Sequence, residues 1–217
     1  MSDYDASRVR MIEDQLERRG IADPQVLAAM RRVPREAFVP EAARADAYRD
    51  GPVSIGEGQT ISQPYIVARM AELAALGPQD VVLDVGAGSG YAAAVLAEIA
   101  GRVYAIERID ALTRRARATL SGLGYHDVEL RTGDGTRGWL EAAPFDAILV
   151  AAAGPVPKAL CRQLKIGGRL VMPVTGPGKW QELKRITRTG ENSWSETAAG
   201  GVSFVPLISG DGENETS

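Results

Sequence analysis

The chain has 217 residues, of which 45% are apolar and 24% charged, and its formal net charge is −3. This length and composition support one globular domain with a substantial core and exclude a wholly disordered chain. The mild negative charge argues against a broad surface for nucleic acid or anionic membranes, so we expect neither partner. A single cysteine, Cys161, and a single histidine, His126, exclude disulfide frameworks and cysteine- or histidine-paired metal sites, so we expect no metal.

The first 50 residues predict a helical cap on a larger domain. Their charged start lacks an apolar stretch, so we expect no signal peptide and a cytoplasmic, monomeric protein. Apolar residues recur at helical spacing over residues 7–19, and Gly20 is a suitable residue to end that helix. A second, short helix is expected over 26–32, and the Ala-rich residues 36–50 indicate a helical turn followed by a loop.

Residues 51–65 predict an ordered loop that leads into a helix. Residues 51–63 (GPVSIGEGQTISQ) contain three glycines and many hydroxyl and amide side chains, but no helical period. Pro64 then begins a helix that we expect to reach Leu76.

From residue 78 onward, short apolar runs alternate with helical patterns. Strands are expected at 81–85, 103–107, 128–132, 145–152 and 168–174, with helices at 90–100, 110–120 and 157–164. This alternation predicts an α/β fold: a Rossmann-like, doubly wound, mostly parallel sheet of about seven strands. Residues 181–188 and 202–208 alternate apolar and polar side chains and are expected as antiparallel edge strands. The core would span 78–210 within a single domain of residues 1–210, followed by a disordered acidic tail, 211–217.

A glycine loop, GAGSG, follows the first of these strands at residues 86–90. Glycines there let the backbone turn sharply and approach a ligand at the carboxyl end of the sheet. Glu107 ends the next strand, where its carboxylate could accept hydrogen bonds from both hydroxyls of a ribose. Asp134, in a Gly-Asp-Gly turn after the third strand, could accept one from the amine of adenine; alternatively it belongs to an ordinary turn.

The loop favours S-adenosylmethionine over a dinucleotide. A dinucleotide fingerprint has a third glycine, G-x-G-x-x-G, where this chain has Tyr91. The carboxylate of Asp84 would be a poor neighbour for pyrophosphate but a good one for the ammonium and sulfonium groups of S-adenosylmethionine. A tight turn without a ligand, or an NAD-dependent oxidoreductase, remains as an alternative at this point.

Several segments together resemble the protein-L-isoaspartate O-methyltransferase family of class I S-adenosylmethionine-dependent methyltransferases. The resemblance extends over residues 11–208, and residues 58–64 (GQTISQP) are its most specific part. The segments that carry it include 33–40 (VPREAFVP), 55–65 (IGEGQTISQPY), 86–91, 133–135 and 204–207 (FVPL). The chain departs from the usual pattern at Ala151, where many members have threonine, and at Ser203, where many bacterial members have arginine.

The resemblance implies repair of damaged proteins by methylation of the free α-carboxylate of L-isoaspartyl residues. Ser62 would be the catalytic hydroxyl and would contact the substrate, although its place before Pro64 also suits a helix N-cap. The cofactor, with S-adenosyl-L-homocysteine as its product, would be held by Gln59, Thr60, Ile61, Asp84, Gly86, Ala87, Gly88, Glu107, Arg108, Asp134 and Gly135. The other substrate contacts would be Gln63, Tyr65 and Val205.

Two other functions fit parts of this pattern. A methyltransferase dedicated to a single partner peptide would use the same site, and we would expect it to carry an added partner-binding region. A cofactor-binding adaptor without catalysis is disfavoured by the joint presence of Ser62, Glu107 and Asp134.

Overall fold

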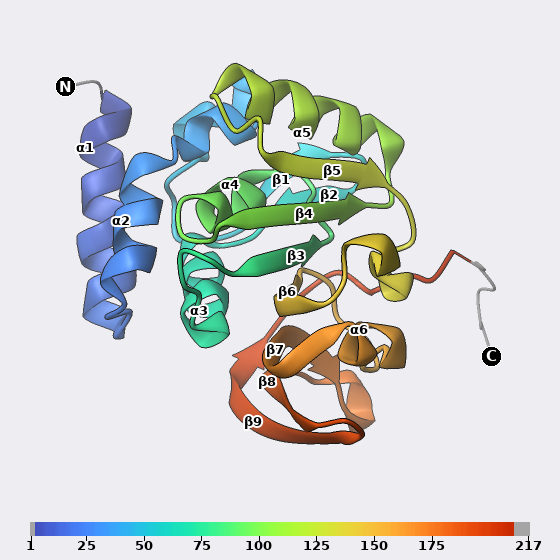
Figure 1. Ribbon diagram of the computed structural model, residues 1–217. Helices are drawn as coiled ribbons and strands as arrows, with labels where there is room; N and C mark the ends of the chain where they lie inside the picture. Colours follow the sequence, from blue (N-terminus) through green and yellow to red (C-terminus); the bar gives the residue numbers. More distant parts are fainter. Residues whose placement is uncertain (1–2, 211–217) are drawn as a thin grey trace.

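The computed structural model describes residues 3–210, and a seven-stranded sheet runs through the molecule (Figure 1). The spatial order of its strands is β5-β4-β3-β6-β7-β8-β9. The strands span Val81–Val85 (β3), Arg102–Glu107 (β4), Val128–Thr132 (β5), Phe145–Val150 (β6), Leu164–Thr175 (β7), Gln181–Gly190 (β8) and Ser193–Val202 (β9). Strands β3 to β7 pair in parallel, whereas β8 and β9 pair antiparallel at one edge. The predicted fold class is confirmed; the expected tail, 211–217, lies outside the described residues.

The two faces of the sheet are covered differently. The helices over one face are α3 (Pro64–Ala74), α4 (Tyr91–Ala97) and α5 (Asp110–Gly122). The other face is covered by α6 (Lys158–Arg162) and the short 3-10 turns η5 (Gly135–Arg137) and η6 (Leu140–Ala142). Because successive residues of a strand face opposite sides, Val82 packs in the first core and Leu83 in the second. This continuous burial on both faces explains why the inner strands are apolar runs in the sequence.

The N-terminal cap is helical, as predicted, but irregular. Its elements are α1 (Asp3–Arg10), a π-helical stretch η1 (Met11–Leu16), a 3-10 turn η2 (Glu17–Arg19), α2 (Pro24–Arg32), and two further 3-10 segments, η3 (Arg35–Phe38) and η4 (Glu41–Asp46). Gly20 ends the first helical run with a φ of 89°, and the side chain of Asp23 caps α2 by accepting from two backbone N–H groups. Between residues 3 and 210, no helix is both long and apolar enough to span a bilayer.

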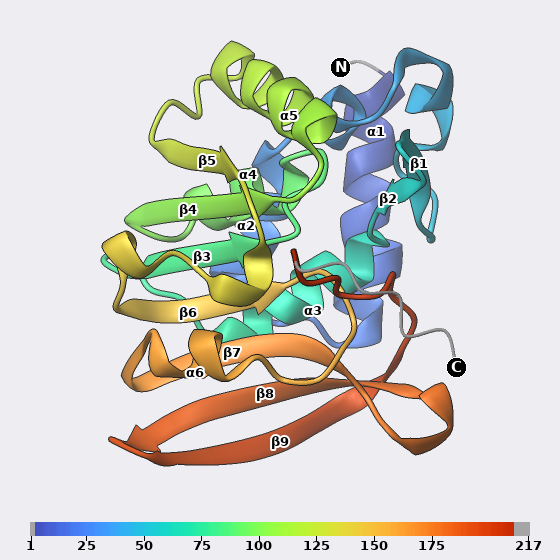
Figure 2. The ribbon, with the colours of Figure 1, turned by 90° about the vertical axis from the view of Figure 1, so that its right-hand side faces the viewer.

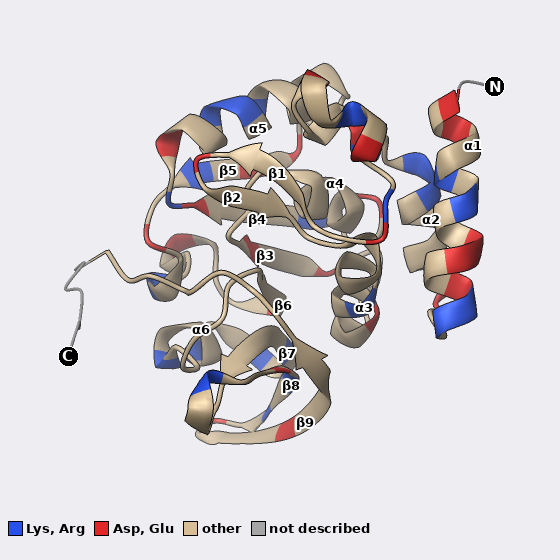
Figure 3. Ribbon diagram, turned by 180° about the vertical axis from the view of Figure 1, so that it is seen from behind, with Lys and Arg blue, Asp and Glu red and all other residues tan. Residues whose placement is uncertain are grey.

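Along α1 the acidic residues lie in the first turn and the basic residues in the last, and α5 carries one aspartate followed by three arginines (Figure 3). Arg114 pairs with Asp110 one helical turn away on α5, and Arg18 pairs with Asp14 in the cap. On α5, basic side chains therefore outnumber acidic ones.

Two expected elements differ in the structure. Residues 51–63 were predicted as a loop, but they contain a hairpin of β1 (Val53–Gly56) and β2 (Gln59–Ile61). The last strand was predicted at 202–208, but β9 ends at Val202, and residues 204–208 instead cross the carboxyl ends of β3 and β6 (Figure 2). Pro206 is bridged to Ala153 there, and Phe204 and Leu207 are half-buried, whereas Val205 and Ile208 remain exposed.

Candidate active site

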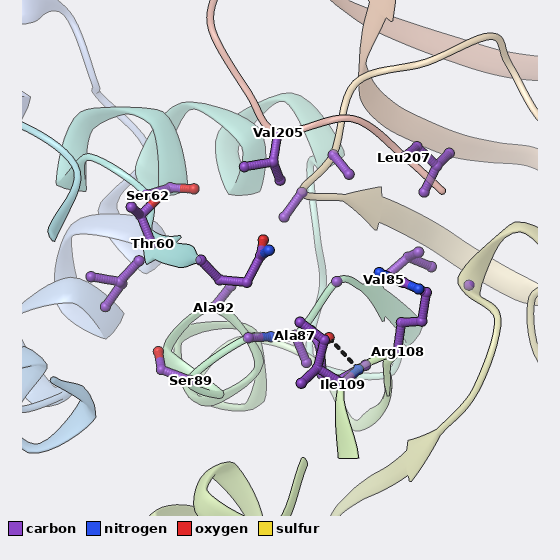
Figure 4. A pocket seen from close by; sticks show the side chains of 18 of the residues that line it. Thr60, Ser62, Val85, Ala87, Ser89, Ala92, Arg108, Ile109, Val205 and Leu207 are labelled. Carbon is purple, nitrogen blue, oxygen red and sulfur yellow. Dashed lines mark hydrogen bonds between the residues drawn. The ribbon is translucent and has the colours of Figure 1, made fainter. Parts of the chain in front are cut away.

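A pocket of about 290 Å³ opens at the carboxyl ends of β3 and β4 (Figure 4). Its walls come from the glycine loop, the end of β4, the β1-β2 hairpin and residues 205–208. Thr60 and Ser62 lie on the opposite side of the pocket from Arg108 and Ile109 (Figure 4). Of the expected site residues, those lining this pocket are Gln59, Thr60, Ile61, Ser62, Gly86, Ala87, Gly88, Glu107, Arg108, Gly135 and Val205.

The glycine loop is tied to β4 by backbone hydrogen bonds. The N–H groups of Gly86 and Ala87 both donate to the carbonyl of Ile106, at 2.8 and 3.1 Å. Gly86, Gly88 and Gly90 have φ angles of 84°, 55° and 87°, in the left-handed region that favours glycine. The loop can therefore bring its backbone against a ligand without side chains in the way.

Glu107 is oriented by the loop that it faces. Its carboxylate is 7% exposed and accepts hydrogen bonds from the N–H of Gly88 at 2.9 Å and of Ile109 at 2.8 Å. Each oxygen keeps further lone-pair capacity on the pocket side. This arrangement presents two fixed acceptors, which suits a pair of vicinal hydroxyls.

Asp84 lies behind the pocket rather than in its wall. Its side chain is 1% exposed, and Oδ2 has no hydrogen-bond partner among the described residues. It borders a small cavity of about 30 Å³ that Ser62 also lines. Burial, reinforced by the charge of Glu107, raises the pKa of Asp84 to about 7.

Asp134 is also beside the pocket, where its carboxylate is already engaged. Oδ1 accepts from the backbone and hydroxyl of Thr136, and Oδ2 accepts from the N–H of Gly210 at 2.8 Å. Burial alone would raise the pKa of Asp134, but these hydrogen bonds outweigh it and lower the pKa. Its neighbour Gly135 lines the pocket, whereas Asp134 itself does not. The adenine contact expected of Asp134 stays a prediction.

Ser62 connects β2 to α3 and is not a helix cap. Gln63 occupies the N-cap position of α3, and no side chain caps that helix. The Ser62 hydroxyl makes no hydrogen bond to any residue between 3 and 210, so the N-cap interpretation is wrong: the chain turns into α3 one residue later. Ser62 lines both the pocket and a wider groove outside it, of about 1030 Å³.

This outer groove is lined by all four expected substrate residues: Ser62, Gln63, Tyr65 and Val205. Asp50 accepts from the Gln63 amide at 2.6 Å and pairs with Arg19 at 3.1 Å. The Arg19 guanidinium stacks on the Tyr65 ring, 3.7 Å from its centroid. The two departures from the family pattern, Ala151 and Ser203, also line the groove.

Residues 203–208 join the groove to the pocket. The carbonyl of Val205 accepts from the N–H of Ala153 at 2.8 Å. The side-chain amide of Gln181 both donates to the carbonyl of Phe204 and accepts from its N–H, at 3.1 and 2.6 Å. Val205 is thereby held where pocket and groove meet.

Sequence reasoning missed several residues of this region: Arg19, Arg35, Lys179, Trp180 and Gln181. Arg35 lies in the VPREAFVP segment, directly after the Val33-Pro34 pair that ends α2, and this position was the available signal. Arg19 belongs to the segment Arg19-Gly20-Ile21, which also resembles the family, whereas residues 179–181 belong to a segment without any local motif.

The parallel sheet, the glycine loop and the acidic residue ending β4 define a class I methyltransferase. In agreement, a solved protein-L-isoaspartate O-methyltransferase matches 92% of this chain and 65% of its own at a TM-score of 0.83 and 26% identity. A Plasmodium falciparum chain, described as a protein-L-isoaspartate O-methyltransferase in complex with S-adenosyl-L-homocysteine, matches 96% of this chain and 99% of its own, with a TM-score of 0.80 and 25% identity.

The sequence comparisons identify the family within this class. The family model for protein-L-isoaspartate(D-aspartate) O-methyltransferase matches residues 6–212. The protein-L-isoaspartate O-methyltransferase of Methylorubrum populi is 60% identical over 96% of this chain and 98% of its own length. That of Rhodopseudomonas palustris is 58% identical over 93% of both chains. The chain therefore belongs to the protein-L-isoaspartate(D-aspartate) O-methyltransferase family.

Proposed function

We propose that this chain transfers a methyl group from S-adenosylmethionine to the free α-carboxylate of L-isoaspartyl residues in damaged proteins and peptides. The ester then collapses without the enzyme to a succinimide, which hydrolyses in part to aspartate. The observation that carries the proposal is the unpartnered hydroxyl of Ser62, placed where the pocket meets the outer groove. Family membership supports the same reaction.

The chemistry requires positioning more than acid–base assistance. A carboxylate with a reference pKa of roughly 3.5 is already ionised at neutral pH, so no general base is needed. S-adenosylmethionine supplies an activated methyl group on a sulfonium. The Ser62 hydroxyl donates a hydrogen bond to one carboxylate oxygen and leaves the other free to approach the methyl group in line, at roughly 3 Å.

The pocket residues divide into three groups by the part of the cofactor they suit. Glu107 suits the ribose hydroxyls, because two backbone N–H groups fix its carboxylate. Gly135, with Asp134 and Arg108, suits the adenine, and the hairpin residues Gln59, Thr60 and Ile61 suit the methionine part. The glycine loop, Gly86 to Gly88, lies between these regions, and Asp84 acts from behind through its negative charge.

The damaged peptide would occupy the outer groove. Gln63 and Tyr65 form one side and Val205 another, while the backbone near them offers strand-like pairing that tolerates many sequences. Such pairing suits an enzyme that acts on many damaged proteins.

The test is methyl transfer from labelled S-adenosylmethionine to two peptides that differ only in having L-isoaspartate or L-aspartate. We expect base-labile label on the isoaspartyl peptide alone. Label on neither peptide, with cofactor binding confirmed, would overturn general repair and point to a dedicated partner. Equal labelling of both peptides would overturn the proposed selectivity.

A further inference from the structure

Arg35 is a fully buried cation without an acidic partner. Its exposed fraction is 0%, and among residues 3–210 no carboxylate lies within ion-pair distance of its guanidinium. One nitrogen, Nη1, has no hydrogen-bond partner within the described part of the chain. Burying an unpaired charge is costly, and a well-packed apolar side chain would avoid that cost. The contacts of Arg35 therefore need an explanation beyond packing.

Those contacts join three segments that are far apart in the chain. Nε donates to the carbonyl of Ala47 at 2.6 Å, and Nη2 donates to the carbonyl of Ser62 at 2.8 Å. The guanidinium carbon lies 4.8 Å from the centroid of the Tyr91 ring. Tyr91 is the first residue of α4, directly after the glycine loop, and is 1% exposed. One side chain thus links the cap, the Ser62 segment and the glycine loop.

The local backbone explains how Arg35 reaches this place. Val33 and Pro34 are extended, with φ angles of −74° and −76°, so α2 ends and η3 begins in a new direction. Phe38, at the end of η3, packs edge-on against Tyr91 with ring centroids 5.6 Å apart. Both ends of η3 are therefore anchored at Tyr91, which limits how far Arg35 can move.

We propose that Arg35 is a positioning residue for methyl transfer, acting through the backbone of Ser62. No hydrogen bond from the described residues restrains the Ser62 hydroxyl itself, so its orientation depends on where the backbone of Ser62 is held. The inference rests on the proposed function, since it assigns a role to Arg35 in that reaction. Arg35 does not line the pocket, so it affects the cofactor only indirectly.

The experiment is a double-mutant cycle of Arg35→Met and Ser62→Ala, with kcat measured at saturating cofactor and isoaspartyl peptide. We expect Arg35→Met to lower kcat about tenfold or more while the Kd for S-adenosylmethionine changes less than about threefold. Because Arg35 acts through Ser62, adding Arg35→Met to Ser62→Ala should lower kcat little further. Arg35→Lys, which keeps the charge but not the two-armed donor, should give an intermediate kcat.

The matched control is Arg8→Met. Arg8 is a second largely buried arginine of the cap, and it bonds to Tyr48 and Glu36 without touching the Ser62 segment. We expect Arg8→Met to lower the Tm and to leave kcat unchanged when both variants are assayed below their Tm.

Three results would overturn the inference: independent, multiplicative effects in the cycle, an equal loss of kcat in Arg8→Met, or a parallel loss of cofactor affinity in Arg35→Met. If Arg35→Met does not fold, the same cycle is run with Arg35→Lys. Failure of the unmodified enzyme to label the isoaspartyl peptide is a separate outcome, since it removes the proposed function itself.

Discussion

Two residues with a buried polar atom that lacks a partner, Arg35 and Asp84, lie next to Ser62. Among the described residues, three buried side-chain atoms lack a hydrogen bond, on Gln15, Arg35 and Asp84. Arg35 donates to the Ser62 carbonyl, and Asp84 borders the small cavity that Ser62 lines. Each such atom lowers the stability of the folded state by about 1–3 kcal/mol. The polar surroundings of Ser62 therefore reduce the stability of the protein. That pattern is expected where function and stability compete.

Replacement of Ser62 by alanine should lower kcat about tenfold to a hundredfold with little change in cofactor affinity. The hydroxyl makes no hydrogen bond within the described chain, so its removal costs no structural contact. Methyl transfer to the isoaspartyl peptide and isothermal titration with S-adenosylmethionine measure the two effects. Ser54→Ala, at an exposed position of β1, is the control and should leave both unchanged. A parallel loss of cofactor binding would make Ser62 a structural residue.

Asp84 should make stability depend on pH. Its pKa is about 7 in the folded protein and roughly 3.9 when unfolded, so the folded state binds the proton more tightly. This stabilisation is complete below about pH 4 and is lost as pH rises through 7. We expect Asp84→Asn to raise the free energy of unfolding, relative to the unmodified protein, by more at pH 8 than at pH 5. The gain is at most about 4 kcal/mol.

Urea denaturation at the two pH values measures this difference. Asp127→Asn, at an exposed position, is the matched control and should change the free energy of unfolding by the same amount at both pH values. A pH-independent effect of Asp84→Asn would show that the carboxyl stays ionised in the folded protein.

At the scale of elements, the turn after β5 is limited by space. A Cβ added to Gly135 would lie 2.3 Å from Cγ1 of Val85, in the wall of the pocket. Gly135→Ala should therefore destabilise the protein by about 1–3 kcal/mol and weaken cofactor binding. Gly122→Ala, where an added Cβ meets no atom within 4 Å, should do neither. Thermal unfolding and cofactor titration of both variants test this prediction. Equal stability and equal cofactor affinity of the two variants would contradict the steric argument.

The elements that sequence patterns predicted well are those buried by their own side chains. The strands β3, β4 and β6 are apolar on both faces, so their runs are visible without any knowledge of the fold. In contrast, β9 is exposed along most of its length and is held by backbone pairing with β8, which leaves no apolar period. Residues 204–208 are also apolar, but 205–208 line the pocket instead of pairing in the sheet. Their composition therefore led to the wrong prediction of a strand.

The site residues also differ in how far sequence patterns could predict them. Glu107 and the glycine loop could be placed from strand ends and spacing, because both follow from the order of parallel strands. The catalytic role of Ser62 was predicted only from the family resemblance. The feature that distinguishes its hydroxyl, the absence of a hydrogen bond within the described chain, leaves no pattern in the sequence. The role of Arg35 could not be predicted from its place in the VPREAFVP segment, because its contacts join it to residues 12 and 27 positions away through folding alone.

For the whole molecule, the cofactor should act as a stabilising ligand. The pocket is walled by the hairpin, the glycine loop and residues 205–208, so a bound molecule bridges parts distant in sequence. At a concentration of about one hundred times Kd, S-adenosylmethionine should add about 2.7 kcal/mol and raise the Tm by about 5–10 °C. Glu107→Gln should reduce this rise, which differential scanning fluorimetry measures. An unchanged rise would remove Glu107 from the cofactor contacts.

The crossing of residues 204–208 over the sheet also sets an order of events during synthesis. Every strand of the sheet precedes this segment in the chain, so a growing polypeptide can assemble β3 to β9 before the last pocket wall emerges from the ribosome. Until then, the glycine loop faces open solvent on that side. The nascent chain should consequently acquire its sheet first and its affinity for a small molecule only after residues 204–208 have emerged.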